Sequence, residues 1–266
     1  MNQQEVISRL LKLDDKVEAF TLTFSGKTSK KVDGLYKPES REIIIHNKNH
    51  PDDNSLMYTA IHEFAHHLQF TRALGHVSAR AHTNEFYNIF HGLLEKAEQL
   101  GIYNNIFEKE PEFVALTKEI KTKFIHVNGS LMKDLGEVLT RAYLLCRQYH
   151  ASFEDFVDRT LGFNRTAAKS AMKMQQLNIN PSIGYDNMKV VASVRDDELR
   201  PLAEKAFLAG KSMDMVKAAF TAKPKPADKA EYLIREKERL EKSLENITAR
   251  LAKIDKELAA MKQGAK

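Results

Sequence analysis

Residues 55–74 constrain the fold of this chain more than any other stretch, because they contain neither glycine nor proline and predict one long helix. Candidate capping residues precede the stretch from Asp52 onward, and Gly75 follows it as a natural helix stop. Apolar side chains recur at every fourth position and can bury one face of the helix against a core: Leu56, Ala60, Phe64 and Leu68. We therefore expect an amphipathic helix that packs into a folded domain.

Residues 62–66 of this helix read His-Glu-Phe-Ala-His. Imidazoles four residues apart lie on one face of a helix, so His62 and His66 can bind one zinc ion from the same side. Glu63 points to the flank, where its carboxylate can take the proton of a water that zinc has activated for attack on a peptide carbonyl. The pattern predicts a zinc-dependent peptidase; the alternative is a helix whose histidines only cap or pack.

A catalytic zinc site needs a third protein ligand. The candidates after His66 are histidines and glutamates: His67, His76, His82, Glu85, His91, Glu95 and Glu98. His82 opens a second predicted helix, Glu95 and Glu98 lie further along that helix, and His76 lies just past the end of the first. Metzincin spacing is excluded, because Arg72 stands where that class of enzyme has a histidine. The residues alone leave the third ligand open.

Short strands are predicted before the zinc helix. Residues 19–24 alternate apolar and polar side chains, and residues 42–46 are rich in β-branched side chains. A helix over residues 3–12 precedes them, so we expect an α+β domain with a small mixed sheet. Residues 42–46 are either an exposed edge that aligns an extended peptide beside the metal or a plain core strand.

Three segments together resemble the SprT-like (Spartan-type) zinc metallopeptidases: residues 34–47, His62-Glu-Phe-Ala-His66 and His82-Thr-Asn-Glu-Phe86. The resemblance covers about residues 15–105 and implies a zincin-like N-terminal domain over residues 1–105. It implies zinc ligation by His62, His66 and His82, with Glu63 as the catalytic carboxylate. Thr83 stands where the family usually has glycine. The zinc ribbon that many members carry is excluded, because Cys146 is the single cysteine of the chain.

Residues 106–220 predict an all-α domain. Helices are expected near 111–124, 129–149, 152–160, 164–177, 186–193, 196–209 and 212–220. Ser152 and Asn164 are candidate caps on either side of a turn at residues 161–163, which is the layout of a helix-turn-helix. Arg165, Lys169 and Lys173 on the second helix are residue types that contact DNA. The alternative is a helical packing domain with a solvated basic face.

Residues 183–212 loosely resemble the helical segment that follows the helix-turn-helix in ParB-like, phage and plasmid regulatory proteins. Both resemblances imply substrates on or near DNA. A net charge of +5 permits contact with nucleic acid but does not demonstrate it.

The tail predicts a linker and a coiled coil. Residues 221–228 contain prolines and no apolar pattern, and residues 229–262 carry a heptad stripe. The stripe residues are Leu233, Leu240, Leu244, Ile247, Leu251, Ile254, Leu258 and Met261. We expect self-association through residues 233–261, and the alternative is that this helix folds back onto the body.

A charged content of 29% and a mean hydropathy of −0.45 predict a soluble protein. No apolar run approaches the about 20 residues that span a bilayer, and the first residues lack a signal-peptide pattern, so we expect no membrane partner and a cytoplasmic location. The predicted function is a Zn²⁺-dependent endopeptidase acting on protein substrates. The alternatives are a peptidase that cleaves a repressor, and a DNA-binding regulatory or scaffold protein whose zinc is structural.

Overall fold

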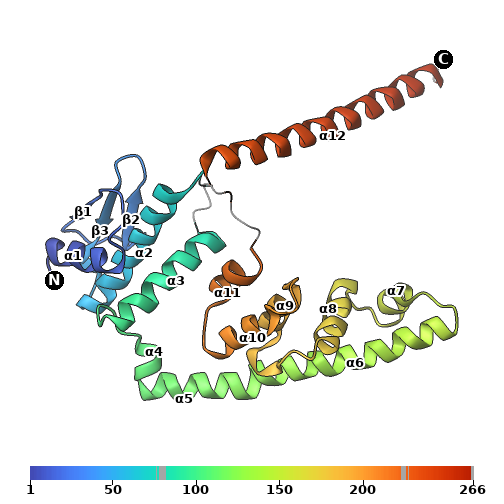
Figure 1. The fold of residues 1–266 in the computed structure, drawn as a ribbon, viewed down its shortest axis with the longest axis horizontal. Coiled ribbons are helices and arrows are strands. Elements are labelled where there is room, and N and C mark those ends of the chain that lie inside the picture. The colour runs from blue at the N-terminus through green and yellow to red at the C-terminus, as the bar shows by residue number, and fades with distance from the viewer. Residues whose placement is uncertain (76, 78–81, 223–225, 227, 265–266) are drawn as a thin grey trace. The chain divides into compact units, whose positions relative to one another are not determined.

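The computed structural model describes residues 1–75, 77, 82–222, 226 and 228–264. These residues are mostly helical and include one small three-stranded sheet, which confirms the α+β class (Figure 1). The strands are β1 (Thr21–Phe24), β2 (Gly34–Lys37) and β3 (Glu42–Ile45). The α-helices are α1 (Gln3–Leu13), α2 (Asp53–Arg72), α3 (Asn84–Gln99), α4 (Ile106–Lys109), α5 (Pro111–Ile120), α6 (His126–Gln148), α7 (Phe153–Asp155), α8 (Arg165–Gln176), α9 (Tyr185–Ser193), α10 (Arg200–Leu208), α11 (Met213–Phe220) and α12 (Lys229–Gly264).

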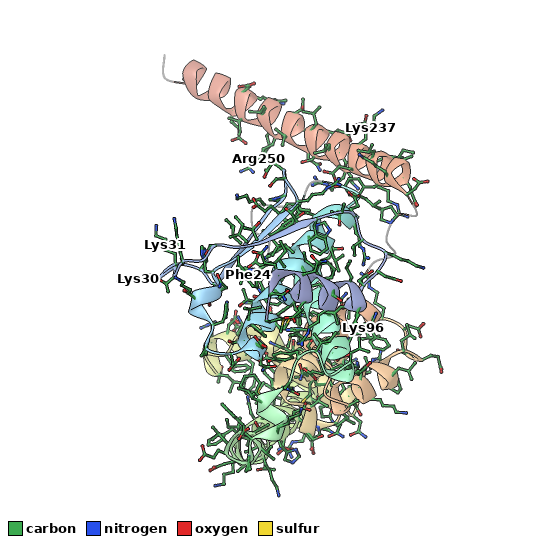
Figure 2. The ribbon with its side chains drawn as sticks, turned by 90° about the vertical axis from the view of Figure 1, so that its left-hand side faces the viewer. Phe24, Lys30, Lys31, Lys96, Lys237 and Arg250 are labelled. Carbon is green, nitrogen blue, oxygen red and sulfur yellow. The ribbon has the colours of Figure 1, made fainter. Side chains whose placement is uncertain are left out.

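The sheet is mixed, as predicted, with the strand order β1-β3-β2. β3 pairs in parallel with β1 and antiparallel with β2. β3 is therefore the central strand, with Ile43 and Ile45 fully buried; of the two alternatives for residues 42–46, the core strand is confirmed and the exposed edge is wrong. The edge positions belong to β1 and β2; the connection between them carries the exposed Lys30 and Lys31 (Figure 2).

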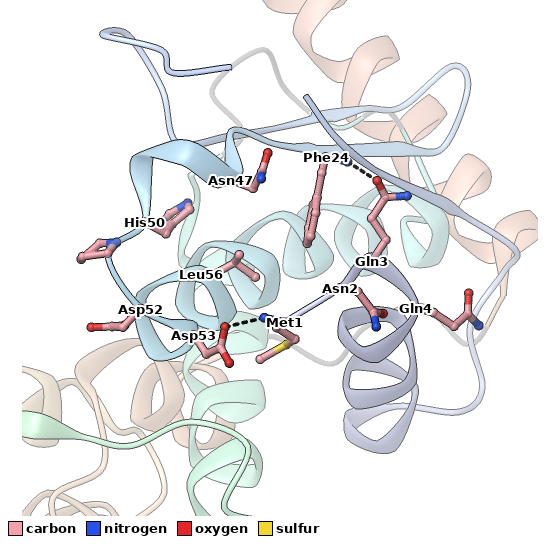
Figure 3. A pocket seen from close by; sticks show the side chains of 11 residues that line it. Met1, Asn2, Gln3, Gln4, Phe24, Asn47, His50, Asp52, Asp53 and Leu56 are labelled. Atoms are coloured by element: carbon pink, nitrogen blue, oxygen red, sulfur yellow. Dashed lines mark hydrogen bonds and ion pairs between the residues drawn. The ribbon is translucent and has the colours of Figure 1, made fainter. Parts of the chain in front are cut away.

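The N-terminal segment ties the first helix to the sheet and to α2. The Met1 ammonium pairs with Asp53 at 2.9 Å, and the backbone N–H of Phe24 donates to Gln3 Oε1 at 3.0 Å (Figure 3). Asn2 caps α1 in a capping box with Glu5. The N-terminal end of α1 is thereby tied to the sheet and to α2.

The helix α2 lies inside the first core and is buried on more than one side. All four residues of the predicted apolar stripe are buried, and so are Met57, Ile61 and Ala65 between them. Since the neighbouring faces are covered as well, polar side chains of α2 are also enclosed: Glu63, His66, His67 and Gln69. The packed helix α3 contributes Phe86, Phe90, Leu93 and Ala97 to the same core.

The helices α5 and α6 form one continuous helical segment, whereas the sequence predicted two separate helices. Two helices were expected near 111–124 and 129–149, but a π-helical stretch, η2 (Lys121–Ile125), joins α5 to α6 without a break (Figure 1). Gly136 lets α6 approach α8, since a Cβ atom there would lie 2.3 Å from the Ala171 carbonyl oxygen. The glycine therefore serves close packing rather than a helix end.

A second hydrophobic core holds the helical region together, with Leu139, Met174, Ile179, Met188 and Val191 essentially inaccessible. The predicted caps are confirmed, because Ser152 Oγ accepts from Asp155 N and Asn164 Oδ1 accepts from Ala167 N. Between these caps, α7 continues into a π-helical stretch, η3 (Phe156–Thr160), and the chain turns at Gly162 with φ of +60°. A helical stretch, a turn and α8 therefore follow one another over residues 153–176.

The C-terminal helix α12 belongs to a separate unit formed by residues 72–79 and 223–266. Within this unit the ring of Tyr232 lies against Gly75. The apolar stripe of α12 is exposed from Leu233 to Ile254, whereas the side chains of Leu258 and Met261 lie outside the described residues. None of the described helices combines the length and apolar character needed to cross a membrane.

Candidate metal centre

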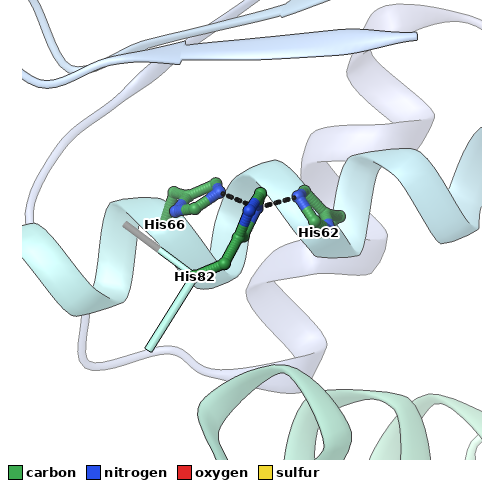
Figure 4. A group of neighbouring side chains, drawn as sticks. All are labelled: His62, His66 and His82. Atoms are coloured by element: carbon green, nitrogen blue, oxygen red, sulfur yellow. Dashed lines mark hydrogen bonds between the residues drawn. The ribbon is translucent and has the colours of Figure 1, made fainter. Parts of the chain in front are cut away.

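Three histidine side chains converge beside α2. His62 and His66 lie one turn apart on the helix, and the chain returns so that His82 stands just before α3. His82 Nε2 lies 3.1 Å from His62 Nε2 and 3.1 Å from His66 Nε2 (Figure 4). One ligand atom from each histidine lies within 4.8 Å of the other two, so these residues are close enough to hold a metal ion.

The other candidates for third ligand do not join this group among the described residues. Glu95 pairs with Lys211, and His91 Nδ1 lies 2.8 Å from Ser212 Oγ. His67 is fully buried, with Tyr36 Oη 3.1 Å from its Nδ1 and the Glu18 carbonyl oxygen 3.0 Å from its Nε2. Glu98 is absent from the cluster and His76 lies outside the described residues. The structure therefore selects the arrangement with His82.

The donor set fits a metal ion. Nitrogens held tetrahedrally at zinc–nitrogen distances of about 2.0–2.1 Å are about 3.3–3.4 Å apart, close to the two observed separations. Burial lowers the pKa of His62 and of His66 to about 4, so both rings are neutral and offer a lone pair near pH 7. The ring of Phe86 packs against all three imidazoles, with centroid distances of 4.9, 4.2 and 4.8 Å to His62, His66 and His82.

Glu63 contacts β2 and lines the same cavity as the three histidines. Its carboxylate accepts a hydrogen bond from the backbone of Tyr36, and a Cβ atom on Gly34 would lie only 2.8 Å from Glu63 Oε1. Glu63 is only 6% exposed, and this burial raises the pKa of its carboxyl group to about 7. A carboxyl group with that pKa can both accept and release a proton near neutral pH.

A cavity of about 550 Å³ brings these groups together, because it is lined by the three histidines, Glu63 and residues of the edge strand β2. A larger hollow of about 720 Å³ lies around Met1 and Asp53 (Figure 3). Within the described residues, that hollow contains no cluster able to hold a metal ion. The smaller cavity is therefore the candidate site of chemistry.

The chain matches no family model, and it matches neither a curated protein nor a solved structure. The centre is therefore interpreted from its own residues and their geometry.

Sequence reasoning missed one pair of residues that supports the centre. Gln69 is buried against the imidazole of His66, and its Nε2 donates to Thr83 Oγ1 at 3.2 Å. Thr83 also caps α3, because its Oγ1 accepts from the backbone N–H of Phe86 at 3.3 Å. The hydrogen bond between Gln69 and Thr83 thus links a residue beside His66 to the residue that follows His82. The spacing of His66 and Gln69, three positions apart on one helix face, was the available signal.

The candidate DNA-contacting residues lie on α8, and two of the three are ion-paired. Arg165 pairs with Asp158, and Lys169 Nζ lies 3.4 Å from a carboxylate oxygen of Glu154. The Asp158 carboxylate raises the pKa of Arg165. Lys173 is exposed on the same helix. The carboxylates of Asp158 and Glu154, which precede α8, therefore offset the positive charge of Arg165 and Lys169. Contact between α8 and DNA stays a prediction.

Proposed function

We propose that this chain is a zinc-dependent endopeptidase of the SprT-like type, with a zincin-like fold over about residues 1–105. The observation that carries the proposal is the convergence of His62, His66 and His82 on one point, with Glu63 lining the same cavity. The order of a small mixed sheet, a helix with two histidines and a third histidine before the next helix supports it. The substrate class is a polypeptide.

The roles of the residues follow from their positions. His62, His66 and His82 would hold the zinc ion through their Nε2 atoms. When bound, zinc supplies Lewis-acid chemistry that lowers the pKa of a water molecule and polarises a peptide carbonyl. Glu63 would accept the proton of the attacking water and return it to the leaving amine. The hydrogen bond from Tyr36 holds the carboxylate of Glu63 toward the cavity side of β2.

The edge strand β2 supplies a means to align a substrate. It borders the cavity, and its outer edge is not paired with another described strand. An extended polypeptide can add to such an edge through backbone hydrogen bonds. Substrate alignment is therefore proposed for β2 and not for the central strand β3.

A structural role for the metal is the rival from another class. Structural zinc sites are closed by four protein ligands, whereas catalytic sites use three and leave one position open. Three histidines form the cluster among the described residues, and a cavity opens beside it. This arrangement favours a catalytic centre over a structural one.

Zinc analysis combined with a cleavage assay tests the proposal. The full chain is assayed on an unfolded protein substrate, alone and with single- or double-stranded DNA. Glu63→Gln should keep its zinc and lose cleavage by about 10²–10⁴-fold, since the side chain can no longer take the proton. His82→Ala should bind zinc much more weakly, while His91→Ala, a histidine outside the cluster, should match the wild type. A zinc-loaded wild type that cleaves no protein in any arm would overturn the peptidase proposal.

A further inference from the structure

The helix α12 exposes an apolar stripe along its length. Six residues of the predicted heptad pattern are between 41% and 64% exposed: Leu233, Leu240, Leu244, Ile247, Leu251 and Ile254. A helix of 36 residues is about 54 Å long. A stripe of this length left in water is unfavourable, because burial of apolar surface is the main stabilising term in helix association.

The spacing of the stripe assigns heptad positions. From Leu240 to Ile254 the steps alternate between four and three residues, which places Leu244 and Leu251 at position a and Leu240, Ile247 and Ile254 at position d. Leu244 with Ile247, and Leu251 with Ile254, combine leucine at a with isoleucine at d, which favours bundles of three or four helices over two; Leu233 and Leu240 place leucine at d in the preceding heptads. Lys237 occupies the preceding a position and is exposed on α12 (Figure 2). A single polar residue at a specifies the register in which helices pair.

The charges beside the stripe distinguish the two possible orientations. In a parallel pair, position g of one helix faces position e of the next heptad in its neighbour, so Arg250 faces the Asp255 of another copy. In an antiparallel pair, g faces g and e faces e. The two antiparallel registers that overlap most place Arg250 opposite Arg250 or Ser243, and Glu241 opposite Asp255 or Thr248. Arg250 therefore meets an opposite charge in the parallel arrangement, and it meets arginine or serine in these two antiparallel ones.

The parallel arrangement also contains a contact between like charges, which is partly neutralised within each helix. Position g is Glu236 and the following e is Glu241, which face each other between copies. Within one helix, Glu236 pairs with Arg239 at 2.6 Å and Glu241 pairs with Lys237 at 3.6 Å. These two cations offset the repulsion between the two glutamates.

We propose that α12 assembles with the same helix of other copies into a parallel, in-register bundle of more than two chains. The occupant of the exposed stripe is thus a further copy of this chain. All copies then enter the bundle from the same end, so the segments that precede α12 emerge together. The proposal does not depend on the peptidase activity, because it concerns residues 233–257 alone.

Light scattering on the full chain over a range of concentrations tests the assembly. The expected mass is that of three or four chains. Leu251→Glu puts a charge at position a and should yield a monomer. Ala252→Glu adds the same negative charge at the neighbouring position b, which faces outward, and should leave the assembly unchanged. This control separates disruption of the apolar stripe from a general effect of added charge. A wild-type mass of one or two chains, or an assembly that survives Leu251→Glu, would overturn the proposal.

A charge swap tests the orientation. Arg250→Asp should shift dissociation to higher protein concentration, because two carboxylates would then face each other between copies. The double variant with Arg250→Asp and Asp255→Arg should restore the wild-type midpoint, since the pair is rebuilt with its signs exchanged. In an antiparallel assembly Arg250 and Asp255 do not face each other, so the single variant would not weaken association and the double variant would not rescue it. That result would overturn the parallel arrangement.

Discussion

The metal region and the helical region use polar residues in opposite ways. In α2 the side chains of Glu63, His66 and Gln69 are buried, and burial shifts the pKa of Glu63 upward and that of His66 downward. On α8 the basic residues stay at the surface, where Arg165 and Lys169 pair with carboxylates. Both regions contain closely approached glycines and capped helices. The difference shows that enclosure, and not the presence of charged residues, creates a site with altered chemistry.

Alanine at two crowded glycines gives the largest expected contrast. Gly136→Ala places a Cβ atom against the Ala171 carbonyl oxygen, and such overpacking costs about 1–3 kcal/mol of unfolding free energy without affecting zinc or cleavage. Gly34→Ala places a Cβ atom against Glu63 and Thr59, whose side chains can move. We expect Gly34→Ala to keep its zinc and to lose most of its cleavage activity, because the catalytic carboxylate is displaced.

Denaturant unfolding, zinc content and cleavage rate measure that contrast. Gly92→Ala is the matched control, since a Cβ atom there meets nothing within 4 Å and alanine favours the helix. Full cleavage activity in Gly34→Ala would contradict the role given to the packing of β2 against Glu63.

Removal of two helix caps sharpens the comparison further. Thr83→Val and Asn164→Ala each remove a side-chain cap and should cost about 0.5–2 kcal/mol of stability. Thr83→Val should also weaken zinc binding by about 10–100-fold, because loss of an outer partner of a metal ligand has that effect. Asn164→Ala should leave zinc affinity unchanged. Equal zinc affinities in the two variants, measured by competition with a chelator, would remove the supporting role of the Gln69–Thr83 hydrogen bond.

Charge reversal on α8 gives the smallest expected effects. Lys169→Glu and Lys173→Glu should each change stability by less than about 1 kcal/mol, since both side chains are exposed. If α8 contacts DNA as its pattern predicts, Lys173→Glu should weaken binding and lower the slope of log affinity against log salt by about 1. Lys169→Glu should have a smaller effect, because Glu154 already engages that ammonium group. Identical wild-type and variant slopes would favour a helical packing domain.

Local patterns determined much of this molecule. The periodicity of residues 55–74 predicts α2, and its two histidines share a face because any helix places positions i and i+4 together. The caps at Ser152 and Asn164, the strands near residues 19–24 and 42–46 and the apolar stripe of α12 are likewise set by neighbours in sequence. The continuous joint at Lys121–Ile125 was not predictable, because nothing in its side chains marks a break or its absence.

Tertiary packing decided the rest. β2 has only four residues, and its sequence shows little alternation of apolar and polar side chains. Pairing with β3 makes it a strand and places it at the edge of the sheet. His82, and not a glutamate of α3, completes the metal cluster because the chain returns beside α2 at His82. The hydrogen bond between Gln69 and Thr83 helps to hold the chain at that place. The sequence by itself determined which residues could bind zinc and which faces are apolar, since these follow from contacts within one element. Only the tertiary structure decided which donors meet and which charges pair, because those contacts join segments far apart in the chain.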